Sequence, residues 1–248
     1  MENLEGFIVL VDISGYTKFV RSHNMKKIPF LGKQVEKKTE AHAEHIISDL
    51  LECVIEELEG TLTVNKIEGD AVLFYSTPAN LNEYPKFLID KIRSSFEIFA
   101  KRLREIAFCD SCPCDACHQM GNLKLKSFIH FGDFMVKRVS RFEELAGENV
   151  ILAHRLMKNS IKSSEYILLT ENANKICGSA YLPAVESRTE SYEDLGEVSV
   201  SVFYPDRETH EPSATDGMSF IKKARQMQQY FKNTYRREQL SEKYTPST

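Results

Sequence analysis

Hydrophobic residues in this chain occur in short unbroken runs and in long stretches with helical spacing. An unbroken apolar run over residues 7–11 predicts a strand that is buried on both faces. Apolar positions recur every three or four residues over 35–58, and Gly60 predicts where this helix ends. A second helix of this kind is predicted over 82–106, with an inner side made of Phe87, Ile92, Phe96, Phe99, Leu103 and Ile106.

Shorter periodic segments complete the pattern. Residues 61–67 and 71–75 predict a hairpin around the turn Glu68-Gly69-Asp70. A short helix is predicted over 149–160, and further strands over 123–131, 134–139 (separated from the preceding strand by Gly132-Asp133), 166–169 and 198–203. The order predicts an α+β domain over residues 1–205, with a ferredoxin-like βαββαβ sheet covered by helices on one face.

The pattern changes after Pro205. Residues 206–216 are polar and predict a linker, and residues 217–240 predict a C-terminal helix with one apolar and one basic face. We assign 206–248 to this linker and amphipathic helix, and we expect the apolar stripe to serve domain packing or dimer contact.

Composition narrows the class of protein. The chain has 248 residues, of which 42% are hydrophobic, and a formal net charge of −4. This length supports one sizeable core, and the charge gives no general attraction for nucleic acid or anionic membrane. The N-terminal apolar run is too short for a signal peptide or a membrane span, so we expect a soluble, cytoplasmic protein.

Two aspartates stand at the ends of predicted strands. Asp12 follows the first apolar run, and Asp70 closes the hairpin turn. A small, hydroxyl-rich turn follows Asp12 directly. If the two carboxylates converge, they can hold a pair of divalent cations against a triphosphate.

Four segments resemble, in order, the motifs of class III nucleotide cyclase catalytic domains. They lie within residues 7–156 and read Asp12-Ile-Ser-Gly-Tyr-Thr-Lys-Phe, Lys66-Ile-Glu-Gly-Asp, Ser127-Phe-Ile-His-Phe-Gly and Gly147-Glu-Asn-Val-Ile-Leu-Ala-His-Arg-Leu. The resemblance implies a nucleotide cyclase-like fold. It also implies conversion of a nucleoside triphosphate to a 3′,5′-cyclic nucleotide and pyrophosphate by two-metal catalysis.

The resemblance also assigns roles to residues. Asp12 and Asp70 would bind two Mg²⁺ or Mn²⁺ ions per site, assisted by the carbonyl of Ile13, and Arg155 would offset charge in the transition state. The turn that would cradle the phosphate groups consists of Ser14, Gly15, Tyr16 and Thr17. Since family sites form between two catalytic domains, a homodimer with composite sites is implied.

Lys66 and Glu144 occupy the positions that read the base in the family. A lysine donor with a carboxylate acceptor suits adenine, so the resemblance favours ATP. Glu144 is one methylene longer than the usual aspartate, and the two residues by themselves remain compatible with pyrimidine triphosphates.

Ile151 departs from the family pattern. The asparagine that orients the ribose in the family is replaced by a side chain that donates no hydrogen bond. Asn149 cannot replace it, because residues two apart on a helix do not share a face. Two alternatives stay open: a slow cyclase, and a nucleotide-binding regulatory module with weak or no turnover.

A cysteine cluster lies outside the family pattern. Cys109, Cys112, Cys114 and Cys117 fall within residues 109–118. Four thiolates suit one tetrahedral zinc ion of structural type, less readily an iron–sulfur cluster, and a metal-free redox loop is the alternative. A third option for the whole chain is therefore a thiol- or zinc-dependent sensor that uses the cyclase core as a scaffold.

Overall fold

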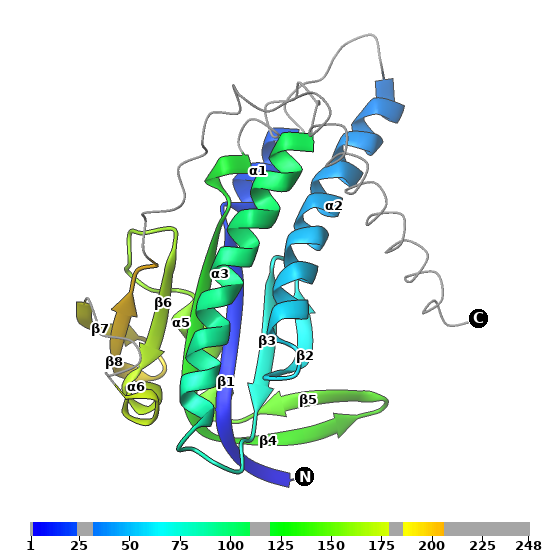
Figure 1. Ribbon diagram of the computed structural model, residues 1–248. Coiled ribbons are helices and arrows are strands. Elements are labelled where there is room, and N and C mark those ends of the chain that lie inside the picture. Colours follow the sequence, from blue (N-terminus) through cyan, green and yellow to red (C-terminus); the bar gives the residue numbers. More distant parts are fainter. Residues whose placement is uncertain (1, 24–31, 110–119, 179–185, 206–248) are drawn as a thin grey trace.

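A mixed eight-stranded sheet forms the centre of the described chain (Figure 1). The computed structural model describes residues 2–23, 32–109, 120–178 and 186–205. The strands are β1 (Glu2–Ser14), β2 (Thr63–Glu68), β3 (Ala71–Ser76), β4 (Lys124–Val139), β5 (Phe142–Ala146), β6 (Tyr166–Thr170), β7 (Glu186–Tyr192) and β8 (Gly196–Phe203). Their order across the sheet is β2-β3-β1-β4-β6-β8-β7, and β5 pairs with β4.

Strand β1 lies inside the sheet, antiparallel to both β3 and β4. Phe7, Val9 and Val11 belong to the core on one face, while Ile8 and Leu10 belong to the core on the other. All five are fully buried. The unbroken apolar run is therefore explained by burial on both faces, as the sequence predicted.

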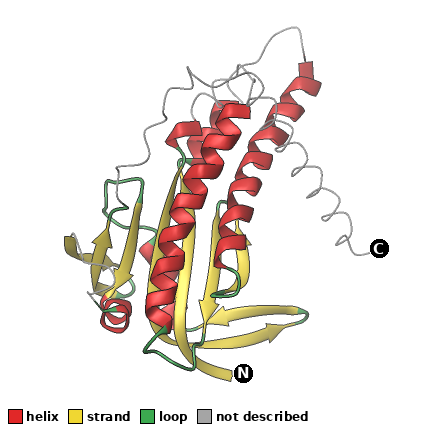
Figure 2. Cartoon of the chain, in the orientation of Figure 1, coloured by secondary structure: helices red, strands yellow, loops and turns green. Residues whose placement is uncertain are grey.

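The two long helices predicted from the sequence cover one face of the sheet. They are α2 (Gly32–Leu58) and α3 (Tyr84–Cys109), and Figure 2 shows them side by side across the strands. A buried ion pair joins them: Arg102 donates from Nε and Nη2 to the two carboxylate oxygens of Asp49, both at 2.7 Å. The short helices α1 (Tyr16–His23) and α6 (Glu171–Cys177) add buried side chains to the same face.

One helix lies on the opposite face. Helix α5 (Glu148–Leu156) buries Val150, Ala153 and Leu156 in the second core. It connects β4 and β5 to β6, and β4 and β6 run parallel. A parallel pair needs such a crossover connection. Helices α2 and α3 cover one face of the sheet as expected, whereas α5 covers the other.

Two details of the sequence prediction were wrong. Phe87 was placed on the inner side of its helix, but it is 50% exposed. Gly132-Asp133 was expected to separate two strands, but β4 runs through both residues. A Cβ on residue 132 would come within 2.7 Å of the Asn149 amide, so this glycine makes room for that side chain without ending the strand.

Other predictions lie outside the described residues. These are the cysteine cluster beyond Cys109 and the segment 206–248. Helices α1 and α6 and strands β5 and β7 were not individually predicted from the sequence. Strand β7 reads Glu-Ser-Arg-Thr-Glu-Ser-Tyr, which has little of the apolar alternation that marks a strand.

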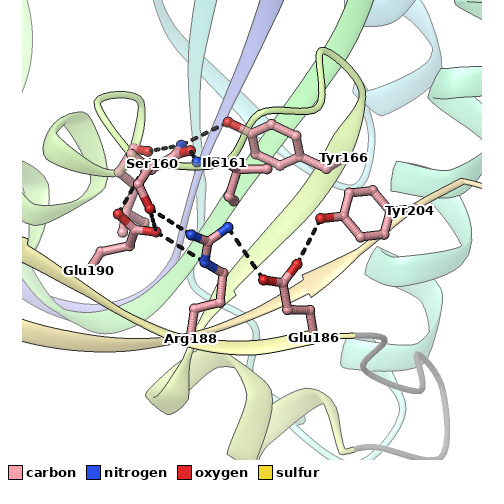
Figure 3. Close-up of polar contacts among 9 residues, drawn as sticks. Ser160, Ile161, Tyr166, Glu186, Arg188, Glu190 and Tyr204 are labelled. Carbon is pink, nitrogen blue, oxygen red and sulfur yellow. Dashed lines mark hydrogen bonds and ion pairs between the residues drawn. The ribbon is translucent and has the colours of Figure 1, made fainter.

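A polar network attaches the loop after α5 to strand β7 (Figure 3). Glu190, which is 6% exposed, accepts hydrogen bonds from the backbone N–H and the hydroxyl of Ser160, both at 2.9 Å. Arg188 donates to the same hydroxyl at 2.7 Å. Asn159 donates to the hydroxyl of Tyr166 on β6, also at 2.7 Å. The C-terminal end of α5 is therefore held against the sheet.

The buried ion pair between α2 and α3 predicts a large effect on stability. We expect Arg102→Ala to lower the free energy of unfolding by about 3 kcal/mol, because it leaves the Asp49 carboxylate buried without its bidentate partner. Chemical denaturation measures this. As a control, Lys86→Ala breaks an exposed pair with Asp90 at 3.4 Å and should cost less than about 0.5 kcal/mol. Equal effects of the two changes would contradict the prediction.

Candidate functional site

Asp12 and Asp70 lie next to each other at one end of the sheet. Asp12 is aligned with Ala71 in the β1–β3 pair. The backbone N–H of Ile13 donates to the carbonyl of Asp70 at 3.0 Å, which connects the end of β1 to the β2–β3 turn. Gly69 permits this tight turn because its φ is +67°. The structure thus brings together the two carboxylates that the sequence singled out.

The environment of this pair disfavours negative charge. Burial raises the pKa of Asp12 to about 6, and the charge of Asp70 adds to the increase, while Lys126 opposes it. The pKa of Asp70 is also raised, mainly by burial and further by Glu44, against the effects of its own backbone hydrogen bond and of Lys126. Bound cations would offset both the burial and the mutual repulsion that raise these pKa values.

Two residues near the pair were missed from the sequence. Lys126 is aligned with Asp12 across the β1–β4 pair, and its ammonium lies 5.4 Å from the centre of the Tyr166 ring. Glu44 on α2 accepts a hydrogen bond from the hydroxyl of Tyr16 at 3.0 Å. Knowledge of the β1–β4 register would have placed Lys126 beside Asp12. Glu44 is one of several acidic residues in the sequence of its helix, so nothing in the sequence marks it.

The turn after Asp12 runs directly into helix α1. Ser14 ends β1, and Gly15 has a φ of +92°. A Cβ on Gly15 would come within 3.1 Å of the carbonyl oxygen of Asn122, so both space and backbone conformation favour glycine. Helix α1 begins at Tyr16. The first N–H groups of a helix lack acceptors within the helix, which is the property that a phosphate-binding turn uses.

Lys66 and Glu144 form a second polar cluster. The ammonium of Lys66 lies 3.2 Å from Oε2 of Glu144 on β5 and 3.0 Å from Oε1 of Glu68. The pKa of Lys66 is raised, first by its hydrogen bond to Glu68 and also by the one to Glu144. The structure brings Lys66 and Glu144 together as expected and adds Glu68, which the sequence analysis had placed only in the turn.

Helix α5 presents the remaining candidates. Arg155 donates from Nη2 to Oδ2 of Asp194 at 2.7 Å, and Nδ1 of His154 lies 3.6 Å from Oε2 of Glu68. Ile151 is 52% exposed on the same helix.

Asn149 is engaged elsewhere. Its Oδ1 pairs with Nε2 of the buried His130 at 2.9 Å, and its Nδ2 donates to the carbonyl of Asp133 at 2.8 Å. Its amide is thus committed at the start of the helix and does not take the place of the missing asparagine at 151.

The donor set around Asp12 fits a divalent cation bound together with a substrate. Within the described ranges, no three His, Cys, Asp or Glu side chains gather as a self-sufficient metal site. Mg²⁺ is usually held by one or two carboxylates, with phosphate oxygens and water completing the shell. Asp12, Asp70 and the carbonyl of Ile13 match that pattern.

The cysteine cluster was predicted to bind zinc. Residues 110–119 lie outside the described ranges, and the side chain of Cys109 is not described. The described thiols, Cys53 and Cys177, are both buried. Burial raises the pKa of each to about 12, so they are protonated and poorly nucleophilic at neutral pH. The zinc site stays a prediction.

Solved structures of nucleotide cyclases share this fold. The guanylyl cyclase Cya2 matches with a TM-score of 0.57 at 12% identity, covering 86% of this chain and 98% of that chain. The adenylyl cyclase CyaB from P. aeruginosa matches with a TM-score of 0.55 at 13% identity, covering 85% of this chain and 100% of that one. At such identities the likeness concerns the fold. Across the described helices, none is long and apolar enough to span a membrane.

Sequence comparison identifies relatives. Residues 47–166 match the family model described as "Protein of unknown function (DUF2652)". The "Uncharacterized protein Rv2561/Rv2562" of Mycobacterium tuberculosis (strain ATCC 25618 / H37Rv) is 31% identical over 176 residues, which are 71% of this chain and 80% of the relative. The chain therefore belongs to the same protein family as this mycobacterial relative, and it has the fold of adenylyl and guanylyl cyclase catalytic domains.

Proposed function

We propose that this protein is a homodimeric nucleotide cyclase that converts a nucleoside triphosphate, with ATP favoured, to a 3′,5′-cyclic nucleotide and pyrophosphate. The observation that carries the proposal is the meeting of two partly buried carboxylates, Asp12 and Asp70, at the end of β1 in a cyclase fold. Such a pair of carboxylates does not stabilise the folded protein by itself. It can supply the ligands that a metal-bound triphosphate requires.

Each candidate residue has a role in this reaction. Asp12, Asp70 and the Ile13 carbonyl would hold Mg²⁺ or Mn²⁺, which supplies Lewis acidity toward the ribose 3′-hydroxyl and charge neutralisation at the phosphates. The amides of the turn Ser14–Thr17 would donate to phosphate oxygens. Arg155 would offset the charge that develops as pyrophosphate leaves.

Lys66 and Glu144 would select the base. In the free protein they pair with each other, so an incoming base must replace that contact with its own. Adenine can do so, because its ring nitrogen accepts from an ammonium and its amino group donates to a carboxylate. This match is the reason for favouring ATP.

A homodimer would join the two clusters, with Asp12 and Asp70 from one subunit and Lys66, Glu144 and Arg155 from the other. The surface near the second cluster supports this arrangement. Several large apolar side chains are more than half exposed there, on β2, the β4–β5 hairpin and α5: Ile67, Val139, Phe142 and Ile151. Contact with a second subunit would cover them.

Product analysis tests the activity. We expect purified protein with Mn²⁺ to form a cyclic nucleotide from ATP in preference to GTP, CTP and UTP, detected by mass spectrometry. Asp70→Ala should lower the rate about 10²–10³-fold or more, since it removes one of two metal ligands. Absence of cyclic product from all four triphosphates, in folded dimeric protein, would refute the cyclase proposal.

The raised pKa of Asp12 predicts a trade between stability and metal binding. A folded pKa above the unfolded value means that the stability contributed by this group is present below about pH 4 and lost as pH rises through about 6. At pH 7.5 we therefore expect the free energy of unfolding of Asp12→Asn to be about 1–2 kcal/mol larger than that of wild type. The difference should shrink toward pH 4, as followed by chemical denaturation.

Manganese should stabilise wild type but not Asp12→Asn, and so should oppose the stability difference between them. Mn²⁺ in excess should raise the melting temperature of wild type, because it binds the folded state, and should leave Asp12→Asn almost unchanged. Asp90→Asn, an exposed charge change on α3, is the matched control and should respond to Mn²⁺ as wild type does. An equal Mn²⁺ response in wild type and Asp12→Asn would place metal binding elsewhere.

The competing proposal is a regulatory module that binds nucleotide without rapid turnover. Ile151 favours it, because an exposed aliphatic side chain stands where the family has a ribose-orienting amide. If the protein is an attenuated enzyme, Ile151→Asn should raise kcat about 10–100-fold with little change in nucleotide affinity. Phe87→Asn, at a similarly exposed apolar helix position (50%) outside the candidate clusters, controls for a general effect of the amide. No gain in kcat for Ile151→Asn would support the regulatory module.

A further inference from the structure

The guanidinium of Arg155 already has an anionic partner within its own chain. Its Nη2 donates to Oδ2 of Asp194 at 2.7 Å. Asp194 lies in the turn between β7 and β8, while Arg155 lies in the last turn of α5. The contact therefore bridges two elements that are far apart in the sequence and meet on the second face of the sheet.

Both ends of this ion pair are anchored. The loop that follows α5 is attached to β7 through Ser160 and Glu190, and the neighbouring His154 contacts Glu68. The β7–β8 turn is closed by a hydrogen bond from the N–H of Leu195 to the carbonyl of Tyr192 at 3.2 Å. The pair is thus a consequence of how the helix and the turn are placed.

We propose that Asp194 competes with the triphosphate for the guanidinium of Arg155 and so lowers the affinity of the site for the triphosphate. This rests on the proposed function, in which Arg155 meets phosphate oxygens. A carboxylate offers the guanidinium the same kind of acceptor as a phosphate, so one must displace the other. The Asp194 charge, once displaced, stays close to the bound anion and repels it.

The exposure of the pair makes displacement feasible. The side chains of Arg155 and Asp194 are 40% and 63% exposed. Exposed ion pairs contribute little to stability, so a multiply charged ligand can open this one at small cost. The turn is also rich in acid, since Glu193 and Glu197 flank Asp194. The local charge thus disfavours a bound anion and would speed release of pyrophosphate.

Removing one charge at a time tests this assignment. In full-length protein with Mn²⁺, isothermal titration calorimetry would measure binding of inorganic tripolyphosphate and of ATP. We expect Asp194→Asn to bind both about tenfold more tightly than wild type, which corresponds to about 1.4 kcal/mol. Glu193→Gln removes the same charge from the adjacent position and should change the affinity less than threefold.

A double-mutant cycle separates competition at Arg155 from a general effect of charge. In an Arg155→Met background the gain from Asp194→Asn should fall below threefold, as for Glu193→Gln, because no guanidinium is left to release and only the loss of a nearby charge remains. Circular dichroism and melting temperature should show that each variant is folded. An equally large gain without Arg155 would overturn the assignment, and so would an Asp194→Asn variant with unchanged affinity.

A lower kcat in Asp194→Asn with unchanged affinity would instead mean that Asp194 holds Arg155 in its working orientation, which also overturns the proposal. These failures differ from failure of the proposed function. If wild type cyclises ATP while Asp194→Asn behaves like wild type, only the role of Asp194 falls. If no variant binds tripolyphosphate or ATP, the proposed function and the inference fall together.

Discussion

Burial of strand β1 on both faces is the constraint on which the site depends. A strand with apolar side chains on each face can lie only inside the sheet, between β3 and β4. That position carries Asp12 to the end of the strand, where the N–H of Ile13 bonds to the carbonyl of Asp70. Two carboxylates distant in the sequence are thereby held together by backbone contacts, whatever their own charges favour.

The candidate residues fall into two electrostatic groups: buried carboxylates, and cationic side chains that already have acidic partners. Asp12 and Asp70 have raised pKa values, chiefly because of burial, so they gain from a cation. Lys66 and Arg155 already have acidic partners in Glu144 and Asp194, so any ligand must compete for them. Under the proposed function, metal binding at the first group and displaced ion pairs at the second would together determine nucleotide affinity.

The same arrangement explains why the site costs stability. An ionised Asp12 disfavours the folded state at neutral pH, whereas the buried Arg102–Asp49 pair joins the long helices with two short hydrogen bonds. A buried carboxylate of this kind is kept in unfavourable surroundings by a core that supplies stability elsewhere. The two long helices and the doubly buried strand provide that core here.

The sequence by itself determined the long helices, the central strand, the hairpin and the identity of the two aspartates. Those features follow from local periodicity and from turn residues such as Gly69, which act over a few positions. It also indicated Lys66 and Glu144, through motif spacing, and the structure places them 3.2 Å apart.

Only the tertiary structure decided which side chains meet across elements. Lys126 faces Asp12 because of strand register, Glu44 reaches Tyr16 because α2 packs beside α1, and Asp194 meets Arg155 because the β7–β8 turn lies against the end of α5. The presence of the polar strand β7 and the face of the sheet that α5 covers were also decided by the tertiary structure. Such contacts depend on packing between segments far apart in the chain, and no local pattern of residues encodes them.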